Sequence, residues 1–289
     1  MSNASLVAAS RQAWSGLEAL HIVGYFADEP RERYVALGLH PRLSYFAARS
    51  AAMGAVGPEV TFATFYVLAP WLHQKALPAA WGIASPEQVV EARRDGVRAA
   101  MARILGSPDI AEALAIARRV TEGLSPSGRP LYAAHAGLDW PEDDLVALWH
   151  AAGLVREHRG DGHVAVLTAA GIAPLEAMVL DGAWSDRREF LKATRGWTEE
   201  EIASAAAGLV ERGWLAADET LTDEGRAVRA GVEERTDTAA MSGWEHVGPA
   251  DTARLAELMA PLRATIVESG LLPPEIQRAL TRIGETGGA

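Results

Sequence analysis

The 289-residue chain contains no cysteine. Disulfides, thiolate zinc sites, cysteine nucleophiles and thiol redox relays are therefore excluded, and the composition fits a reducing compartment. No apolar run approaches the roughly 20 residues that a membrane-spanning helix needs. We therefore expect a cytoplasmic protein without a membrane partner. The first four residues, MSNA, resemble a remnant of an expression vector, and the sequence alone leaves open whether they are native.

Basic residues are also scarce, with 27 lysines and arginines against 38 aspartates and glutamates and a net charge of −11. The deficit is local, because residues 139–240 hold 10 basic and 21 acidic side chains whereas residues 1–138 hold 13 and 11. A nucleic-acid-binding surface needs basic side chains that neutralise phosphates. The charge therefore disfavours DNA as a partner of this acidic region.

Hydrophobic residues, by contrast, make up 49% of the chain, enough for one large core or two ordinary ones. Their spacing is helical almost throughout, as Trp14, Leu17 and His21 illustrate. Pro70 and Pro78 interrupt the apolar stretch over residues 60–83, which predicts two or three short helices there. The predicted fold class is mainly α.

Residues 121–130, TEGLSPSGRP, have the composition of a linker. We therefore divide the chain into an aromatic-rich helical half over 1–125, a second part over 126–240, and C-terminal helices over 241–289. The second part is expected to hold a helix pair followed by the pattern described next.

The most regular pattern lies in residues 174–238. Helices are predicted over 174–180, 187–194 and 198–212, the last with a capping box formed by Thr198 and Glu201. The following residues alternate and turn like a short hairpin with Leu215 and Leu221 facing inward, and another helix is predicted over 224–238. Three helices, a hairpin and a helix form the order of a winged helix-turn-helix.

The stretch LVERGWLAADETLTDEGRAVRAGVEERTD, residues 209–237, resembles the third helix, wing and following helix of MarR-like winged-helix proteins. The whole chain resembles a family of helix-turn-helix proteins of about 280 residues from high-GC bacteria. Three segments carry this wider resemblance: YFAARSAAMG (45–54), LYAAHAGLDWPEDDLVALWHAAGLVREHRGDGHVA (131–165) and KATRGWTEEE (192–201). The resemblance implies a fold and not a particular activity.

Two parts of the chain also resemble each other. Residues 18–41 parallel residues 147–174, with a histidine and a later Gly-x-x-Pro in each. One interpretation is an internal duplication, in which two winged-helix-like halves form a pseudo-two-fold tandem. The alternative is chance similarity within a chain rich in alanine and leucine.

Residues 156–163, REHRGDGH, place two histidines, two carboxylates and two arginines within eight positions. We predict a loop here, between a helix that ends near Val155 and another that begins near His163. His158, Asp161 and His163 supply the ligand types of a two-histidine, one-carboxylate site for a divalent metal. The alternatives are a charged loop with local ion pairs and an anchor for a polar ligand.

Residues 160–165 also match the G-x-G-x-x-A fingerprint of dinucleotide-binding proteins. That fingerprint is meaningful where a strand precedes it and a helix follows. A helix is predicted to precede it here, which disfavours a nucleotide.

Eleven of the nineteen aromatic residues lie within the first 81 positions. Such a set can line a pocket for a flat or apolar ligand, or it can fill a helical core. The candidate ligand-binding residues are His21, Tyr25, Arg49, Tyr66, Trp71, Trp149, His150 and Glu157. For His21 and His150 taken singly, a core position is the simpler interpretation.

The leading hypothesis is a winged-helix-derived small-molecule-binding protein, whether sensor, sequestering protein or enzyme, with a pocket between the N-terminal half and residues 148–163. The first alternative is a MarR-like DNA-binding regulator, acting as a homodimer, in which Arg187, Arg188, Lys192 and Arg195 approach the DNA backbone. Glu199, Glu200 and Glu201 argue against it, since the start of this helix would enter the major groove. The second alternative is a metal-dependent enzyme built on His158, Asp161 and His163. No catalytic residue and no organic cofactor is assigned.

Overall fold

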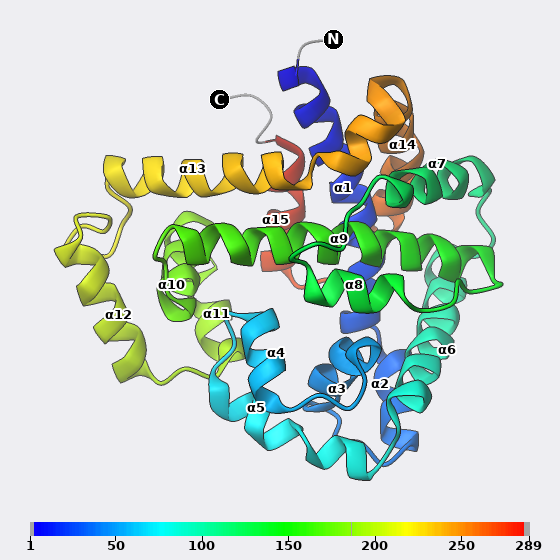
Figure 1. Cartoon of the computed structure of the whole chain (residues 1–289), viewed down its shortest axis with the longest axis horizontal. Helices are drawn as coiled ribbons and strands as arrows, with labels where there is room; N and C mark the ends of the chain where they lie inside the picture. The colour runs from blue at the N-terminus through cyan, green and yellow to red at the C-terminus, as the bar shows by residue number, and fades with distance from the viewer. Residues whose placement is uncertain (1–2, 186, 286–289) are drawn as a thin grey trace.

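The computed structural model describes residues 3–185 and 187–285, and within them it is helical, with one isolated β-bridge and no strand (Figure 1). Residues 1 and 2 of the predicted vector remnant lie outside the described residues. The helices are α1 (Asn3–Phe26), α2 (Asp28–Ala36), α3 (Ser44–Ser50), α4 (Pro58–Phe65), α5 (Pro70–Ala76), α6 (Pro86–Leu105), α7 (Ala111–Glu122), α8 (Pro130–Ala136), α9 (Asp144–Ala169), α10 (Pro174–Ser185), α11 (Arg188–Arg195), α12 (Glu199–Glu211), α13 (Asp223–Ala240), α14 (Ser242–Glu268) and α15 (Pro274–Glu285), with short 3-10 helices η1 (Ala51–Met53) and η2 (Ala79–Gly82).

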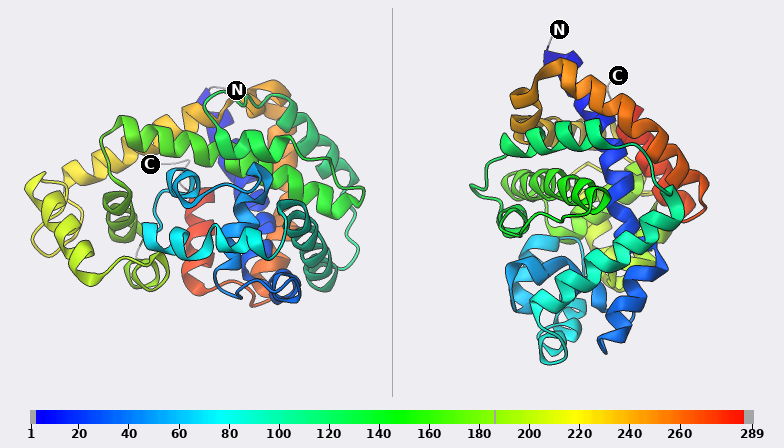
Figure 2. Two further views of the ribbon diagram at one scale, coloured as in Figure 1. Left: turned by 60° about the horizontal axis from the view of Figure 1, so that its bottom comes forward. Right: turned by 90° about the vertical axis from the view of Figure 1, so that its right-hand side faces the viewer.

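The largest core forms where α1 packs against α9 in the middle of the molecule, with α7 and α14 beside them (Figure 2). The ring of His21 stacks on Trp149 at 5.3 Å and 4°, and the indole of Trp149 donates to the carbonyl of His21. A Cβ on Gly153 would lie 3.1 Å from the His21 ring, so a glycine there permits the close approach of the two helices. The same core includes Met259 from α14. It therefore contains residues from all three predicted parts of the chain, 1–125, 126–240 and 241–289.

A second core, built around Phe46, Phe65 and Leu77, holds α2 to α6 together. The apolar stretch over residues 60–83 is broken into α4, α5 and η2, and α5 begins at Pro70. The predicted division into short helices is confirmed. Proline is tolerated at the first position of a helix because no partner is available there for its missing N–H.

The third core joins α10 to α13, with Leu209, Leu215 and Leu221 buried at its centre. The three predicted helices are present, and Thr198 forms the predicted capping box with Glu201. Leu215 and Leu221 form an antiparallel bridge, and α13 follows. The predicted helices are therefore confirmed, while between α12 and α13 the described residues hold one isolated bridge and no strand.

The prediction of a loop over residues 156–163 is wrong, because these residues lie within the continuous helix α9. Gly162 faces a neighbouring side chain, since a Cβ there would lie 2.5 Å from Nη1 of Arg129. The glycine thus permits close packing against the helix and does not form a turn. The N–H groups of residues 160–165 belong to the interior of this helix, so they cannot cradle a phosphate as a helix N-terminus does.

Among the described helices, no single one is long and apolar enough to span a membrane. Helices α9 and α10 meet those criteria only as a pair, and the chain bends by 107° between them.

Candidate functional site

A cavity of about 1650 Å³ lies between α1, the α3–α5 region, α9, α10, α11, α13 and α15. Nine lysines and arginines line it, against seven aspartates and glutamates. In the whole chain the balance is reversed, with 27 basic and 38 acidic residues. The lining of the cavity therefore has an excess of basic residues, although the protein as a whole is acidic.

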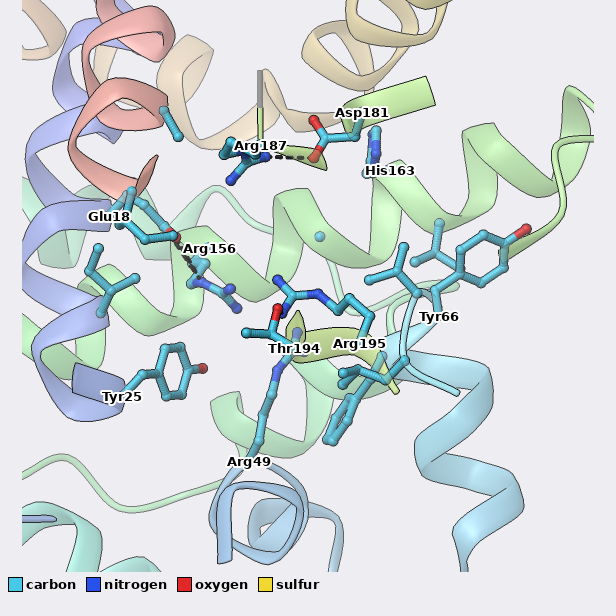
Figure 3. Close-up of a pocket in the computed structure, with 18 of the residues that line it drawn as sticks. Glu18, Tyr25, Arg49, Tyr66, Arg156, His163, Asp181, Arg187, Thr194 and Arg195 are labelled. Carbon is cyan, nitrogen blue, oxygen red and sulfur yellow. Dashed lines mark hydrogen bonds and ion pairs between the residues drawn. The ribbon is translucent and has the colours of Figure 1, made fainter. Parts of the chain in front are cut away.

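Three arginines from distant parts of the chain converge on one side of the cavity: Arg49 of α3, Arg156 of α9 and Arg195, the last residue of α11 (Figure 3). We call these three residues the arginine corner. Each guanidinium lies over an aromatic ring, with the carbon 4.4 Å from the centre of Phe65 for Arg49, 5.4 Å from Tyr25 for Arg156 and 5.9 Å from Phe190 for Arg195. A guanidinium that stacks on a ring still presents the N–H groups of its edge to a ligand.

Glu157 joins two members of the corner. Its carboxylate, only 1% exposed, accepts from Nη2 of Arg49 at 2.9 Å and from Nη1 of Arg156 at 2.8 Å. Burial by itself would raise the pKa of Glu157, but the two guanidinium groups hold it well below its usual value. Glu18 adds an ion pair with Arg156 at 3.2 Å. The corner thus has two carboxylates for three guanidinium groups.

Arg195 is the member with no carboxylate oxygen within 4.0 Å in the part of the chain that the structure describes, although the more distant charge of Asp181 acts to raise its pKa. Its Nη1 donates to the hydroxyl of Thr194 at 2.8 Å, and burial lowers the pKa of its guanidinium. Within the described residues, Nε and Nη2 of Arg195 and Nη2 of Arg156 donate to no protein acceptor. These N–H groups are available to a ligand in the cavity.

The pKa of Tyr45 indicates a positive electrostatic potential at the arginine corner. Its hydroxyl accepts from Nη1 of Arg49 at 3.2 Å. Burial would raise the pKa of the Tyr45 phenol, yet the charges of Arg49, Arg156 and Arg195 lower it. A site that favours a phenolate also favours other anions.

A second group of charges, which we call the paired end, consists of the cavity-lining residues Arg187, Arg229, Asp181, Glu233 and Asp237 together with Arg159, which pairs with them but does not line the cavity. Every guanidinium here has a carboxylate partner: Arg187 with Asp181 at 2.6 Å, Arg229 with Glu233 at 2.5 Å, and Arg159 with Glu233 at 3.0 Å and Asp237 at 2.9 Å. Although burial opposes it, Arg229 and Arg159 lower the pKa of Glu233 to about 2.

The remaining walls are largely apolar. Ile22 and Phe26 of α1 face the cavity, as do Ile276 and Leu280 of α15. Trp71 and Trp184 also line it while remaining 48% and 37% exposed. The cavity therefore offers one cationic corner and a broad hydrophobic surface.

Five of the eight predicted ligand-binding residues line this cavity, namely Tyr25, Arg49, Tyr66, Trp71 and Glu157. The structure does not place the other three there.

His21, Trp149 and His150 are buried in the core instead, because they fill the contact surfaces between helices. His21 and Trp149 stack on each other, and His150 meets the ring of Trp140 at 5.0 Å. Burial lowers the pKa of His21 far below its usual value and that of His150 to about 3, which keeps both rings neutral.

The structure does not assemble the predicted metal ligands His158, Asp161 and His163. On one helix, positions 158 and 163 point about 140° apart. The ring of His158 packs on Tyr132, Asp161 accepts from the backbone N–H of Tyr132 at 2.9 Å, and Nδ1 of His163 lies 2.9 Å from the hydroxyl of Thr236. No group of three His, Asp or Glu residues in the described chain could hold a metal ion.

Sequence reasoning missed Arg156, Tyr45 and the cavity-facing position of Arg195. Arg156 was within reach, since it adjoins the predicted Glu157 in a charged segment. Arg195 was considered only in the alternative of a DNA-binding regulator, and its position at the cavity follows from the contact of its backbone carbonyl with Ala69.

Helices α11 and α12 are joined by a tight turn at Gly196, which has a left-handed φ of 81°. The model of the helix-turn-helix family matches residues 10–273 of the chain. No curated protein and no solved structure matches it. Since the match covers most of the 289 residues, the chain belongs to the helix-turn-helix family.

Proposed function

We propose that this chain is a winged-helix-derived protein that binds a small organic anion in the cavity. The observation that carries the proposal is the arginine corner, where three guanidinium groups face two carboxylates and Arg195 faces none. In the same proposal, α10 to α13 form a MarR-like winged helix whose wing is the turn between Leu215 and Leu221.

The corner suits a carboxylate or a phosphate. Both groups accept two parallel N–H bonds from one guanidinium, and such charge-assisted bonds are stronger than neutral ones. A charged group withdrawn from water without a partner is costly, so an anion that pairs with Arg195 offsets that cost.

The body of the ligand is expected to be hydrophobic. Pockets for drug-sized ligands measure about 300–1,000 Å³, and the cavity at about 1650 Å³ exceeds that range. An inorganic ion would leave most of it unfilled. An amphipathic or aromatic acid would place its anionic group at the corner and its body against Phe26, Leu280 and Trp184.

A matched pair of fluorescent probes tests the proposal. Anilinonaphthalene sulfonate carries an anionic group, and phenylnaphthylamine has the same ring system without it. We expect the wild-type protein to bind the sulfonate, and Arg195→Gln to weaken that binding roughly ten- to a hundredfold, because a charge-assisted bond is lost. Binding of the neutral probe should stay within about twofold of wild type.

Arg187→Gln is the matched control, because Arg187 lines the same cavity but is paired with Asp181. It should change the affinity for the sulfonate much less than Arg195→Gln does. A wild-type protein that binds no sulfonate, or equal binding by wild type and Arg195→Gln, would contradict the proposal.

The second candidate is a DNA-binding regulator, which membership of the helix-turn-helix family favours. The structure offers little for phosphates to contact: α12 exposes Glu199, Glu200 and Glu211 and contains no basic residue.

Three of the four basic residues expected at the DNA form ion pairs within the chain, and the fourth lines the cavity. Arg187 pairs with Asp181, Arg188 with Glu219, Lys192 lies 3.6 Å from Glu189, and Arg195 lines the cavity. Specific DNA binding that persists at about 150 mM salt would place this candidate first.

A further inference from the structure

Residues 66–72, which comprise the connection between α4 and α5 and the first three residues of α5, run along the turn of the helix-turn-helix, and we call them the strap. Three hydrogen bonds connect the two: the N–H of Ala69 to the carbonyl of Arg195 at 2.9 Å, the indole of Trp71 to the carbonyl of Gly196 at 2.6 Å, and the indole of Trp197 to the carbonyl of Val67 at 2.9 Å. The strap and the turn are more than 120 positions apart in sequence. These bonds hold α11 and α12 in one position, which we call docked.

The strap and the turn of the helix-turn-helix each contain a residue with a positive φ angle. Gly196 has a left-handed φ, and a Cβ there would come 2.5 Å from the side chain of Leu72. Tyr66 has a φ of 59°, and its hydroxyl donates to the carbonyl of Ile172, just ahead of α10, at 2.6 Å. Non-glycine residues adopt such a φ where the surrounding contacts enforce it. The strap is therefore fitted to the helix-turn-helix.

The docked helix-turn-helix is also a wall of the cavity. Arg187, Phe190, Ala193, Thr194, Arg195 and Gly196 all line it. If α11 moved away from the strap, this wall would be lost and Arg195 would leave the arginine corner. An anion held by all three arginines therefore requires the docked position.

Electrostatics gives the coupling a direction. Burial lowers the pKa of the docked Arg195 guanidinium. The charges of Tyr45 and Asp181 act in the opposite direction, and the neighbouring cations Arg187 and Arg49 lower the pKa further. Like charges at short range repel, particularly where water is partly excluded. An empty cavity thus opposes docking, and an anion between the guanidinium groups reverses that effect.

From this arrangement we propose that an anion in the cavity stabilises the docked position of the helix-turn-helix, and that docking in turn raises the affinity for the anion. The two effects are equal by thermodynamic linkage. This inference rests on the proposed function, because it needs an anion at the arginine corner. It makes the helix-turn-helix the responding element of a ligand sensor.

Hydrogen exchange of the full chain tests the coupling, with anilinonaphthalene sulfonate as the probe. If the probe binds only the docked state, the opening that exposes α11, α12 and the strap is suppressed by one plus the ratio of free probe to its Kd. At a concentration about a hundred times Kd, exchange in residues 66–72 and 188–211 should slow about a hundredfold. Amides of α7 that exchange by local opening serve as the reference and should not change.

A pair of tryptophan variants provides the second arm. Trp197→Phe removes one hydrogen bond to the strap, and Trp197 is outside the cavity lining. Without probe, it should speed exchange in residues 66–72 and 188–211 about fivefold, the effect of one net hydrogen bond. Trp214→Phe is the control, because Trp214 stacks on Arg212 beyond α12 and should leave exchange of the strap unchanged.

The outcomes separate the two proposals. If the sulfonate binds through Arg195 but exchange in residues 66–72 and 188–211 is the same with and without it, the coupling is wrong and the proposed function stands. If wild type and Arg195→Gln bind the sulfonate equally, the proposed function fails, and the coupling fails with it. Protection in these segments that Arg195→Gln weakens in proportion to its affinity supports both.

Discussion

The arginine corner and the paired end contain the same residue types and differ in how their charges are balanced. At the paired end, each of Arg159, Arg187 and Arg229 has a carboxylate within 3.0 Å. At the arginine corner, Arg195 has none among the described residues. Paired charges that tie α9, α10 and α13 together are explained by the fold alone. An unbalanced guanidinium on a cavity wall is better explained by an anion that arrives from outside.

The largest expected effect comes from unbalancing the corner further. Glu157→Gln removes the carboxylate that Arg49 and Arg156 share, leaving two buried cations without it. We expect the free energy of unfolding to fall by about 3–5 kcal/mol, the usual cost of breaking a buried ion pair. Denaturant unfolding measures this, and added sulfate should restore part of the loss. A fall below about 1 kcal/mol would show that the corner is not desolvated.

The next largest effect is expected from a substitution that removes ion pairs at the paired end. The pKa of Glu233 is about 2 in the folded protein, below its ordinary 4.5. A depressed pKa contributes stability above the unfolded value that is lost as pH falls through the folded one. Glu233→Gln should therefore cost up to about 3 kcal/mol at pH 7 and flatten the loss of stability between pH 4.5 and pH 2. Affinity for the sulfonate probe should stay near wild type; a tenfold loss would remove the distinction between the arginine corner and the paired end.

Asp161 lines the cavity, and burial raises its pKa from 3.8 to about 6. The folded state therefore favours the protonated acid, and ionisation costs stability as pH rises from 3.8 through 6. Asp161→Asn should raise the free energy of unfolding by about 1–2 kcal/mol at pH 7, with the gain nearly gone at pH 4. An equal gain at both pH values would mean that the benefit is not electrostatic.

The smallest effect on stability, and the sharpest contrast, is expected for Arg195→Gln. Because Arg195 has no carboxylate to abandon, the free energy of unfolding should stay unchanged or rise by up to about 1 kcal/mol. The same substitution at Arg187 leaves Asp181 without its guanidinium and should destabilise the protein. If both variants lose equal stability, Arg195 serves the fold and not a ligand.

Local signals in the sequence predicted most of the secondary structure. Pro70 marks the start of α5, and Thr198 with Glu201 caps α12 as expected. The prediction for residues 156–163 failed because charged residues and glycines suggest a loop, whereas these residues pack against Arg129 and Tyr132 as part of a helix. Tertiary contacts of this kind override local propensity.

The cavity was only partly predictable, for the same physical reason. Tyr25, Arg49 and Glu157 could be chosen because aromatic and charged residues cluster near them. For His21 the sequence left a core position and a pocket position open, since its place depends on the packing of α1 against α9. Arg195 could not be placed, since its position depends on docking of α11 against the strap. The internal duplication, the three-part division of the chain and the homodimer stay predictions.

A crystal structure of the protein with anilinonaphthalene sulfonate distinguishes the arginine corner from the paired end most directly. We expect the sulfonate oxygens to accept from Arg195 and Arg156 at the arginine corner, with the rings against the apolar wall and the helix-turn-helix docked on the strap. A sulfonate at the paired end, or on the outer surface with the cavity empty, would contradict the claim that this family member binds organic anions at an unbalanced arginine.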